Sequence, residues 1–277
     1  MRFTKMHGLG NDYVYVNCFT EQVHDPEALA LTVADRHTGI GSDGLILVKP
    51  AAGADAAMEI YNADGSRGGM CGNGIRCVAK LVIDHGLAPG PVLRIATDDG
   101  LKTCWCDLER GKVARVRVDV GAPTLLAREV PILVDAERAI DREVVVAGRP
   151  WRLTAVGLGN PHAVVFVEDL GDVDLARIGP AFERDPVFPQ RVNAHFVRVD
   201  SRSHVTMKTW ERGSGATRAC GTGASAVCVA AAVTGRTDRK ITATLPGGDL
   251  MLEWGEDDHV YKTGPAVEVF QGDWPGG

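Results

Sequence analysis

A single offset of 149 residues relates several motifs in the two halves of this 277-residue chain. The motif GLGN ends at Asn11 and ends again at Asn160, and a cysteine followed by glycine stands at Cys71 and again at Cys220. Several matches that share one offset without slippage indicate an internal duplication. The sequence therefore predicts two domains of the same fold.

The repeat extends beyond these motifs, and it suggests where one domain ends. Further pairs at the same offset are MEIY (58–61) with MKTW (207–210), Asn62 with Glu211, and Gly44 with Asn193. The chain is long enough for two ordinary domains. With the junction placed near VDVGAP, we predict one domain from residues 1–118 together with 264–277, and a second from residues 119–263.

Short strands dominate each half. Nine segments are rich in β-branched and aromatic residues and are bounded by turn residues: DYVYVNCF, GLILV, AMEIYN and VLRIAT, then WRLTAV, HAVVFV, HFVRV, HVTMKTW and KITATL. Helical periodicity follows each repeated cysteine, with one apolar face over residues 74–86 and apolar residues nearly all round over 223–235. The amphipathic segments 26–37 and 174–185 are expected to be connectors.

These patterns predict an α+β fold with two pseudo-symmetric domains. Each domain is expected to be an antiparallel, barrel-like shell of strands around a central buried helix. The active site is expected in the cleft between the domains, because such clefts are common places for small-molecule sites.

Composition restricts the partners of the chain. A net charge of −6, without any basic block, gives no electrostatic footprint for nucleic acid. No apolar run approaches the roughly 20 residues that a membrane span needs. The first residues, MRFTKMHGLGNDYVYVN, do not read as a secretory signal, so we expect a cytoplasmic protein whose partner is a small molecule.

The repeated cysteines lie where a helix would change their chemistry. Cys71 and Cys220 each precede a Gly-x-Gly turn and a predicted helix, so unpaired backbone N–H groups and the positive end of the helix dipole favour a thiolate. The glycines of both turns let the backbone approach a ligand, and their N–H groups suit a carboxylate. Two domains of one fold would aim two such thiols at one cleft.

The other five cysteines have a simpler explanation. Cys77 and Cys228 lie within the predicted helices, and Cys104 and Cys106 share one face of a strand, so all four are expected in the core. Cys18 carries no signal. With no export signal, free thiols are favoured over disulfides, and the cysteine spacings do not match a structural zinc site. We expect neither a metal nor a cofactor.

Seven motifs in succession resemble those of the diaminopimelate epimerase family: GLGNDYVYV, RHTGIGSDGLI, YNADGSRGGMCGNGIRC, GNPHAVVF, RVNAHFV, WERGSGATRACGTGASA and LPGGDLMLEW. The resemblance runs from about Phe3 to Gly272. Proline racemases and hydroxyproline epimerases also use two cysteines, but usually carry His where this chain has Asn73. Many members of the diaminopimelate epimerase family carry Gln where this chain has Gly44.

The resemblance implies a cofactor-independent, two-base epimerisation of an amino-acid α-carbon. It assigns Cys71 as the proton donor and Cys220 as the proton acceptor from the LL to the meso isomer of 2,6-diaminopimelate, on the path to lysine and peptidoglycan precursors. His162 and Glu211 resemble residues that tune the thiols. The resemblance also implies a homodimer and a substrate site formed by Asn11, Asn62, Gly72, Asn73, Asn160, Asn193, Glu211, Arg212, Gly221 and Thr222.

The polar residues favour a substrate with two amino-acid heads. Two helix N-termini suffice for one carboxylate, so Arg212 and the asparagines would serve a second head, with Arg212 as a fork for the distal carboxylate. Another two-thiol racemase, of the proline or hydroxyproline type, would keep the thiols but would not need Arg212. A thiol redox or metal-binding protein would not need carboxylate-binding glycines on both helices.

Overall fold

The computed structural model describes residues 1–275 and divides into two compact units. Unit 1 comprises Met1–Asp119 and Thr263–Gly277, and unit 2 comprises Val120–Lys262. These boundaries lie one residue from those predicted from the sequence. Within the described residues, no helix combines the length and apolar composition that crossing a membrane requires.

Unit 1 contains most of the first ten elements of the chain together with the last strand. Its strands are β1 (Arg2–Gly8), β2 (Asn11–Asn17), β3 (Gly44–Lys49), β4 (Ala56–Asn62), β5 (Arg67–Gly68), β6 (Val92–Thr97), β7 (Gly100–Glu109), β8 (Lys112–Gly121) and β18 (Val267–Asp273). Its helices are α1 (Pro26–Ala34) and α2 (Gly74–Asp84). β8 runs across the boundary into unit 2.

Unit 2 repeats this order of elements and adds β9 and η1. Its strands are β9 (Arg142–Val146), β10 (Arg149–Gly157), β11 (Pro161–Phe166), β12 (Asn193–Ser201), β13 (His204–Glu211), β14 (Gly215–Ala216), β15 (Lys240–Leu245) and β16 (Gly248–Trp254). Its helices are α3 (Leu175–Arg184), α4 (Gly221–Val233) and the short 3-10 turn η1 (Leu170–Asp172). Strand β17 (Val260–Pro265) crosses back into unit 1.

Strand pairing follows the same pattern in both units. In unit 1, β1–β2, β3–β4 and β6–β7 are antiparallel, whereas β2–β3 and β4–β6 are parallel. In unit 2, β10–β11, β12–β13 and β15–β16 are antiparallel, whereas β11–β12 and β13–β15 are parallel. The predicted α+β duplication is confirmed, although each shell is mixed rather than purely antiparallel.

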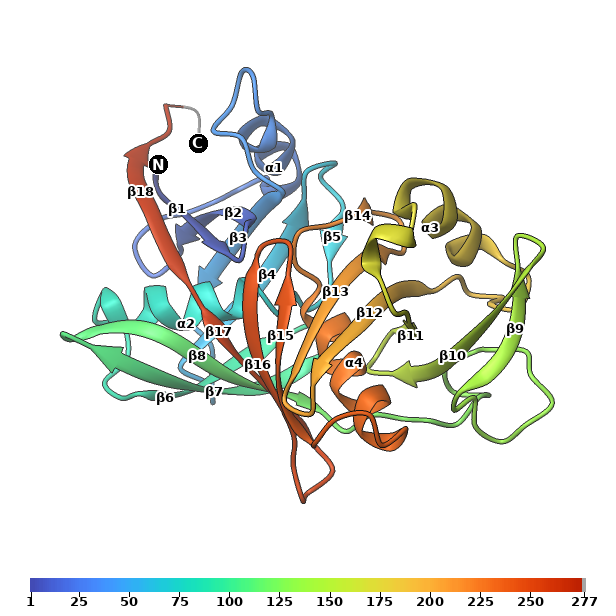
Figure 1. Ribbon diagram of the computed structural model, residues 1–277. Coiled ribbons are helices and arrows are strands. Elements are labelled where there is room, and N and C mark those ends of the chain that lie inside the picture. The colour runs from blue at the N-terminus through green and yellow to red at the C-terminus, as the bar shows by residue number, and fades with distance from the viewer. Residues whose placement is uncertain (276–277) are drawn as a thin grey trace. The chain divides into compact units, whose positions relative to one another are not determined.

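One helix lies at the centre of each unit (Figure 1). In unit 1, α2 packs against β1, β2, β4, β6 and β7, and its apolar face joins the larger core cluster. In unit 2, α4 packs against β10, β11, β12, β15 and β16, and nearly all its residues are buried, as its continuous apolar sequence predicts.

The connector helices cover the opposite faces of the strands. α1 begins at Pro26 after Asp25, whose side chain accepts a hydrogen bond from the Ala28 N–H, and packs on β2, β3 and β4. Strand β3 therefore lies between two helices, which explains its continuous apolar sequence GLILV. α3 is capped in the same way by Asp174 and packs on β12 and β13.

Candidate active site

The Cys71 thiol lies just before the central helix of unit 1. Cys71 stands two residues before Asn73, the N-cap of α2, and is partly exposed. Its Sγ accepts a hydrogen bond from the Gly74 N–H at 3.3 Å and donates one to Asn11 Oδ1 at 3.3 Å. Two residues that the sequence predicted as site residues, Cys71 and Asn11, are therefore in direct contact.

Asp43 fixes which end of the Asn11 amide faces the thiol. Asn11 Nδ2 donates to Asp43 Oδ2 at 2.7 Å, while Arg36 Nη2 donates to Asp43 Oδ1 at 2.9 Å. An ionised carboxylate only accepts hydrogen bonds, so the group facing Asp43 must be the NH₂ of Asn11. Tyr13 lies beside Cys71 and Asn11, and its burial raises the pKa of its hydroxyl far above the ordinary range.

A fully buried guanidinium holds the turn between Cys71 and its helix. Arg76 Nη1 donates to the carbonyl of Gly72 and to Asn73 Oδ1, both at 3.0 Å, and Arg76 Nε donates to the carbonyl of Pro265 at 3.1 Å. The side chain is 0% exposed, and its Nη2 would touch any Cβ placed on Gly8. Arg76 thereby ties the cysteine turn to both ends of the unit 1 sequence.

The Cys220 thiol is the N-cap residue of α4 and is buried, with 3% of its surface exposed. Burial raises its pKa well above the ordinary value, the adjacent Glu211 carboxylate raises it further, and the Gly223 N–H and Thr222 hydroxyl oppose the rise. The helix terminus alone predicts a lowered pKa, but here burial outweighs it. The predicted neighbour Glu211 therefore adds to the rise in the pKa of Cys220.

His162 belongs to a buried chain of hydrogen bonds rather than to a thiol contact. His162 Nε2 lies 2.6 Å from Asn160 Oδ1, and its Nδ1 lies 2.9 Å from His195 Nε2. His195 Nδ1 lies 3.0 Å from the hydroxyl of Thr209. Both ring nitrogens of His162 are thus engaged with other side chains. Burial lowers the pKa of His195 to about 3 and that of His162 well below its usual value.

Asn193 and Arg212 are joined within unit 2. Asn193 is 3% exposed; its Nδ2 donates to the carbonyl of Pro161 at 2.9 Å, and its Oδ1 accepts the backbone N–H of Arg212 at 3.0 Å. The Arg212 side chain is exposed, and its Nη1 donates to the carbonyl of Gln190 at 3.1 Å. Asn193 therefore positions the chain at Arg212, which presents its guanidinium to solvent.

The remaining predicted residues lie at the two turns. Asn62, at the end of β4, donates from Nδ2 to the hydroxyl of Ser66 at 3.0 Å. Asn73 and Gly72 are held by Arg76, whereas Gly221 and Thr222 open helix α4. Thr222 Oγ1 lies 3.9 Å from the sulfur of Cys220.

The position of Gly44 leaves no room for a side chain. Its φ is +154°, and a Cβ there would overlap the carbonyl oxygen of Tyr61 and approach a ring carbon of Tyr13 to 3.0 Å. The backbone of this chain at the start of β3 therefore requires glycine.

Sequence reasoning missed four residues that organise the predicted site: Tyr13, Asp43, Arg76 and His195. All four stand inside motifs that the repeat or the resemblance had singled out, namely NDYV, GSDG, GIRC and NAHF. No property of the residues themselves marked them, because their roles depend on partners distant in sequence. A buried arginine inside an apolar helical face was the one local signal available.

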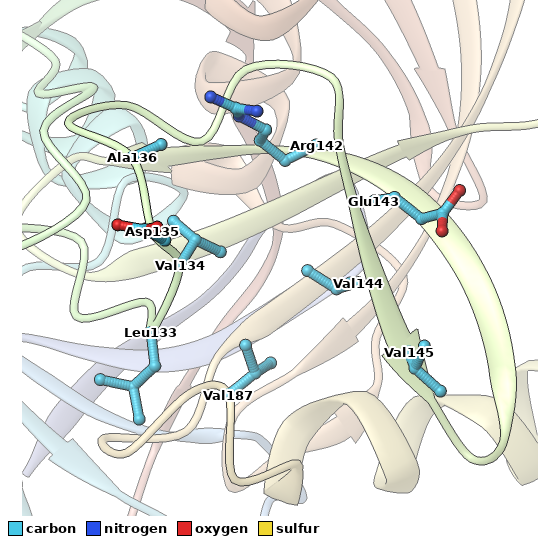
Figure 2. A pocket seen from close by; sticks show the side chains of 9 residues that line it. All are labelled: Leu133, Val134, Asp135, Ala136, Arg142, Glu143, Val144, Val145 and Val187. Atoms are coloured by element: carbon cyan, nitrogen blue, oxygen red, sulfur yellow. The ribbon is translucent and has the colours of Figure 1, made fainter.

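A hollow of about 330 Å³ lies elsewhere in unit 2 and contains no predicted site residue (Figure 2). It is lined by Leu133, Val134, Asp135, Ala136, Arg142, Glu143, Val144, Val145 and Val187. Leu133 and Val145 are 65% and 62% exposed, so the hollow is a shallow surface feature. Among residues 1–275, no three His, Cys, Asp or Glu side chains are grouped as metal ligands.

Comparison with known proteins gives a specific sequence match. Residues 3–126 and 154–269 match the family described as diaminopimelate epimerase. The diaminopimelate epimerase of Acetivibrio thermocellus is 50% identical over 274 residues, covering 99% of this chain and 98% of its own length. The corresponding enzyme of Moorella thermoacetica is 50% identical, with 99% of each chain covered.

Solved structures share the fold at low sequence identity. A probable proline racemase from Agrobacterium radiobacter aligns with a TM-score of 0.73 and 16% identity, covering 100% of this chain and 93% of its own. A hydroxyproline epimerase from Agrobacterium vitis aligns with a TM-score of 0.67 and 18% identity, covering 98% and 90%. These similarities establish the duplicated fold alone.

Proposed function

Because the chain belongs to the diaminopimelate epimerase family, we propose that it interconverts LL- and meso-2,6-diaminopimelate by a cofactor-independent, two-thiol reaction. The observation that carries this proposal is a cysteine at the start of the central helix in each half of a duplicated fold. Inversion of a carbon requires a proton to leave one face and another to arrive at the opposite face, which takes two acid–base groups.

In the LL to meso direction, the Cys220 thiolate takes the α-proton and the Cys71 thiol gives its proton to the other face of the carbanion. The hydrogen bond from the Cys71 thiol to Asn11 Oδ1 supports the protonated starting form of the donor. Burial supports the role of Cys220, since a thiolate with a raised pKa is a stronger base toward a weakly acidic C–H bond. In the reverse direction the two roles exchange.

Before Cys220 can act as a base, its thiol must lose a proton. The Glu211 carboxylate beside it is the group we propose to receive that proton, and its negative charge then disappears as the thiolate forms. Glu211 also accepts a hydrogen bond from the Thr217 hydroxyl, which orients the carboxylate.

Backbone N–H groups at the two helix starts would hold the reacting carboxylate. Gly72 and Asn73 offer them in unit 1, and Gly221 and Thr222 in unit 2. Oriented N–H groups at helix termini stabilise the negative charge that builds up on the carboxylate as the α-proton leaves. Arg76 supports this arrangement in unit 1, because its hydrogen bonds to the Gly72 carbonyl and the Asn73 side chain fix the turn that carries these N–H groups.

The second amino-acid head would be bound by the exposed Arg212 guanidinium together with Asn160. Asn62 and Asn193 would shape the adjoining turns, since their amides already hold Ser66, Pro161 and the Arg212 backbone. An arginine fork matches a distal carboxylate. Proline lacks that group, which is why diaminopimelate fits this set of residues better.

We further propose that the enzyme works in the cytoplasm, in lysine and peptidoglycan precursor synthesis, as a homodimer. All seven cysteines are free thiols, and free thiols persist in a reducing compartment. Unit 1 exposes apolar side chains on β18, at Val267, Val269 and Phe270, and these would favour a partner subunit.

A substrate panel tests the proposed function. The reduced protein, with no added cofactor, is incubated with LL-diaminopimelate, L-proline and trans-4-hydroxy-L-proline, and the products are separated by chiral chromatography. We expect the meso isomer from diaminopimelate and no inversion of the two imino acids. Racemisation of proline with no turnover of diaminopimelate would overturn the assignment.

A further inference from the structure

Asn11 and Asn160 are equivalent in the repeat, but they lie in different hairpins. In unit 1, Gly8 pairs with Asn11 across a two-residue turn, in which Leu9 and Gly10 have φ values of 59° and 82°. These positive angles are typical of a type I′ turn. In unit 2, Gly157 pairs with Pro161, so Asn160 belongs to a three-residue turn. The two asparagines consequently meet different neighbours.

The neighbours of the two asparagines are also where the repeat diverges. Asp43, which holds Asn11, is replaced by Val192 at the equivalent position of unit 2. His195 and Thr209, which continue the chain from Asn160, are replaced in unit 1 by Ile46 and Ile60, both in the apolar core. Each unit therefore has its own buried support for its asparagine.

In unit 2, hydrogen bonds link Asn160 through His162 and His195 to Thr209. With Asn160 Oδ1 as the acceptor, His162 carries its proton on Nε2 and accepts at Nδ1. His195 then carries its proton on Nε2, and its Nδ1 accepts from the Thr209 hydroxyl. Because Asn160 Oδ1 accepts from His162, the Nδ2 group of this amide is the part available to a ligand. Asn160 is partly exposed.

We propose that Asp43 and His195 are positioning residues that hold the two equivalent asparagines in opposite amide orientations, so that Asn11 offers its carbonyl oxygen to Cys71 while Asn160 offers its NH₂ group to substrate. In unit 1 an amide carbonyl favours the thiol over the thiolate, which keeps a proton on the donor cysteine. In unit 2 an NH₂ group suits a carboxylate oxygen. The second half of this inference rests on the proposed function.

The tautomers of His162 and His195 test the direction of these hydrogen bonds without any measurement of activity. In the full-length reduced protein, labelled with ¹⁵N at histidine, two-bond nitrogen–proton couplings identify the protonated nitrogen of each ring. We expect His162 and His195 both to carry their proton on Nε2 in the absence of substrate. A proton on Nδ1 of either ring would reverse the chain, turn the Asn160 carbonyl outward and overturn the proposal.

Two variants of His195 separate positioning from simple packing. The Gln Nε2 group can take the place of the His Nε2 donor, whereas the shorter Asn cannot reach His162. We expect His195→Asn to raise the KM for diaminopimelate about tenfold, equal to about 1.4 kcal/mol, with kcat within about twofold. His195→Gln and the control His204→Gln, a histidine bonded to Thr244, should stay within about twofold of wild type. Equal losses in the Asn and Gln variants would contradict a positioning role. If the protein does not turn over diaminopimelate at all, the histidine tautomers still test the direction of the hydrogen bonds from Thr209 to Asn160.

Alkylation of Cys71 tests the half of the proposal that concerns Asp43. Asp43→Asn lets Asn11 turn its NH₂ toward the sulfur, so iodoacetamide should modify Cys71 at neutral pH about tenfold faster. Asp98→Asn, which removes the exposed partner of Arg67, is the matched control and should change nothing. If Asp43 acts on Cys71 through Asn11, Asp43→Asn should change the alkylation rate of Cys71 little in a protein that already carries Asn11→Ala. An equal acceleration in that background would show that charge alone acts and would overturn the proposal for Asp43.

Discussion

The seven cysteines of this chain differ in what surrounds each sulfur atom. Cys77 is fully buried in α2, and burial raises its pKa to about 11. Cys71, six residues earlier, has a backbone N–H donor on one side and an amide carbonyl on the other. Cys220 is as buried as a core thiol, yet it lies against a carboxylate. Cys71 and Cys220 therefore differ from Cys77 in position, since each lies at the start of a central helix, whereas Cys77 lies within one.

Alanine variants should separate these classes. Cys71→Ala and Cys220→Ala each remove one acid–base group, so kcat should fall at least about 10²- to 10⁴-fold, with the folded state retained. Cys77→Ala should cost about 1 kcal/mol in the free energy of unfolding and leave kcat within about twofold. Chiral product analysis and urea unfolding measure the two effects. Near-normal epimerisation by either of the first two variants would contradict the two-thiol reaction.

The buried histidines should make the protein sensitive to acid. His195 has a pKa of about 3 in the folded state, against about 6.5 when unfolded. Below about pH 6.5 the unfolded state binds a proton at this histidine and the folded state does not. The contribution of His195 to the free energy of unfolding is therefore fully present above that pH and falls as the pH drops toward 3. The loss is up to about 1.4 kcal/mol per pH unit for each such histidine.

Replacing one histidine tests that slope. Urea unfolding between pH 6.5 and 4.5 should show a shallower loss of stability for His195→Gln than for wild type, because one protonation site is gone. His204→Gln, as the matched control, should keep the wild-type slope. Parallel curves for wild type and His195→Gln would show that this histidine does not resist protonation in the folded state.

At the scale of elements, the two central helices are equivalent but begin differently. α2 begins at Gly74, whereas α4 begins at Gly221, two residues earlier in the repeat. Each has one fully buried cation near its start: Arg76 comes from α2 itself, whereas Lys262 comes from β17 and lies against Gly221. Ser225 stands where unit 2 would repeat the arginine, and its hydroxyl donates to the Gly221 carbonyl.

The arginine within α2 should be needed for both stability and turnover. Arg76→Met leaves the Gly72, Asn73 and Pro265 acceptors without their donor, and unsatisfied buried groups cost about 1–3 kcal/mol each. We expect a loss of about 2–4 kcal/mol in unfolding free energy and a strong fall in kcat. Arg94→Met, on an exposed strand position, should change neither. Unchanged stability and kcat in Arg76→Met would contradict the proposed support of the Cys71 turn.

Much of the secondary structure was predictable from the sequence. The alternating, β-branched segments all became strands, and both helices that follow the cysteines formed as predicted. The strands β1, β8, β9, β16 and β17 and the terminal β18 were not predicted, since their polar and apolar residues mix with turn signals. Of β7, only the segment around Cys104 and Cys106 was predicted as a strand. A few parallel pairings also escaped prediction, because partners such as β4 and β6 are joined by a helix rather than a turn.

At the scale of the whole molecule, the duplication was the most informative feature. One offset predicted both the shared strand pairing and the pairing of functional positions such as Cys71 with Cys220. The offset shows where the halves differ, with Asp43, Arg76 and His195 replaced by Val192, Ser225 and Ile46, but it does not show which side chains those three residues contact. Those differences matter for function, since the proposed proton donor and acceptor need different surroundings.

Solvent deuterium gives the most direct measurement of the central claim. The reduced protein is mixed with LL-diaminopimelate in deuterated water without any cofactor, and the products are read by mass spectrometry and NMR at early times. The two-thiol reaction predicts that each meso molecule formed carries one deuterium at the inverted α-carbon, because the new hydrogen comes from a solvent-exchanged Cys71 rather than from the proton removed by Cys220. Early meso product that keeps the original hydrogen would mean that one group returns the same proton, and would contradict the two-thiol reaction.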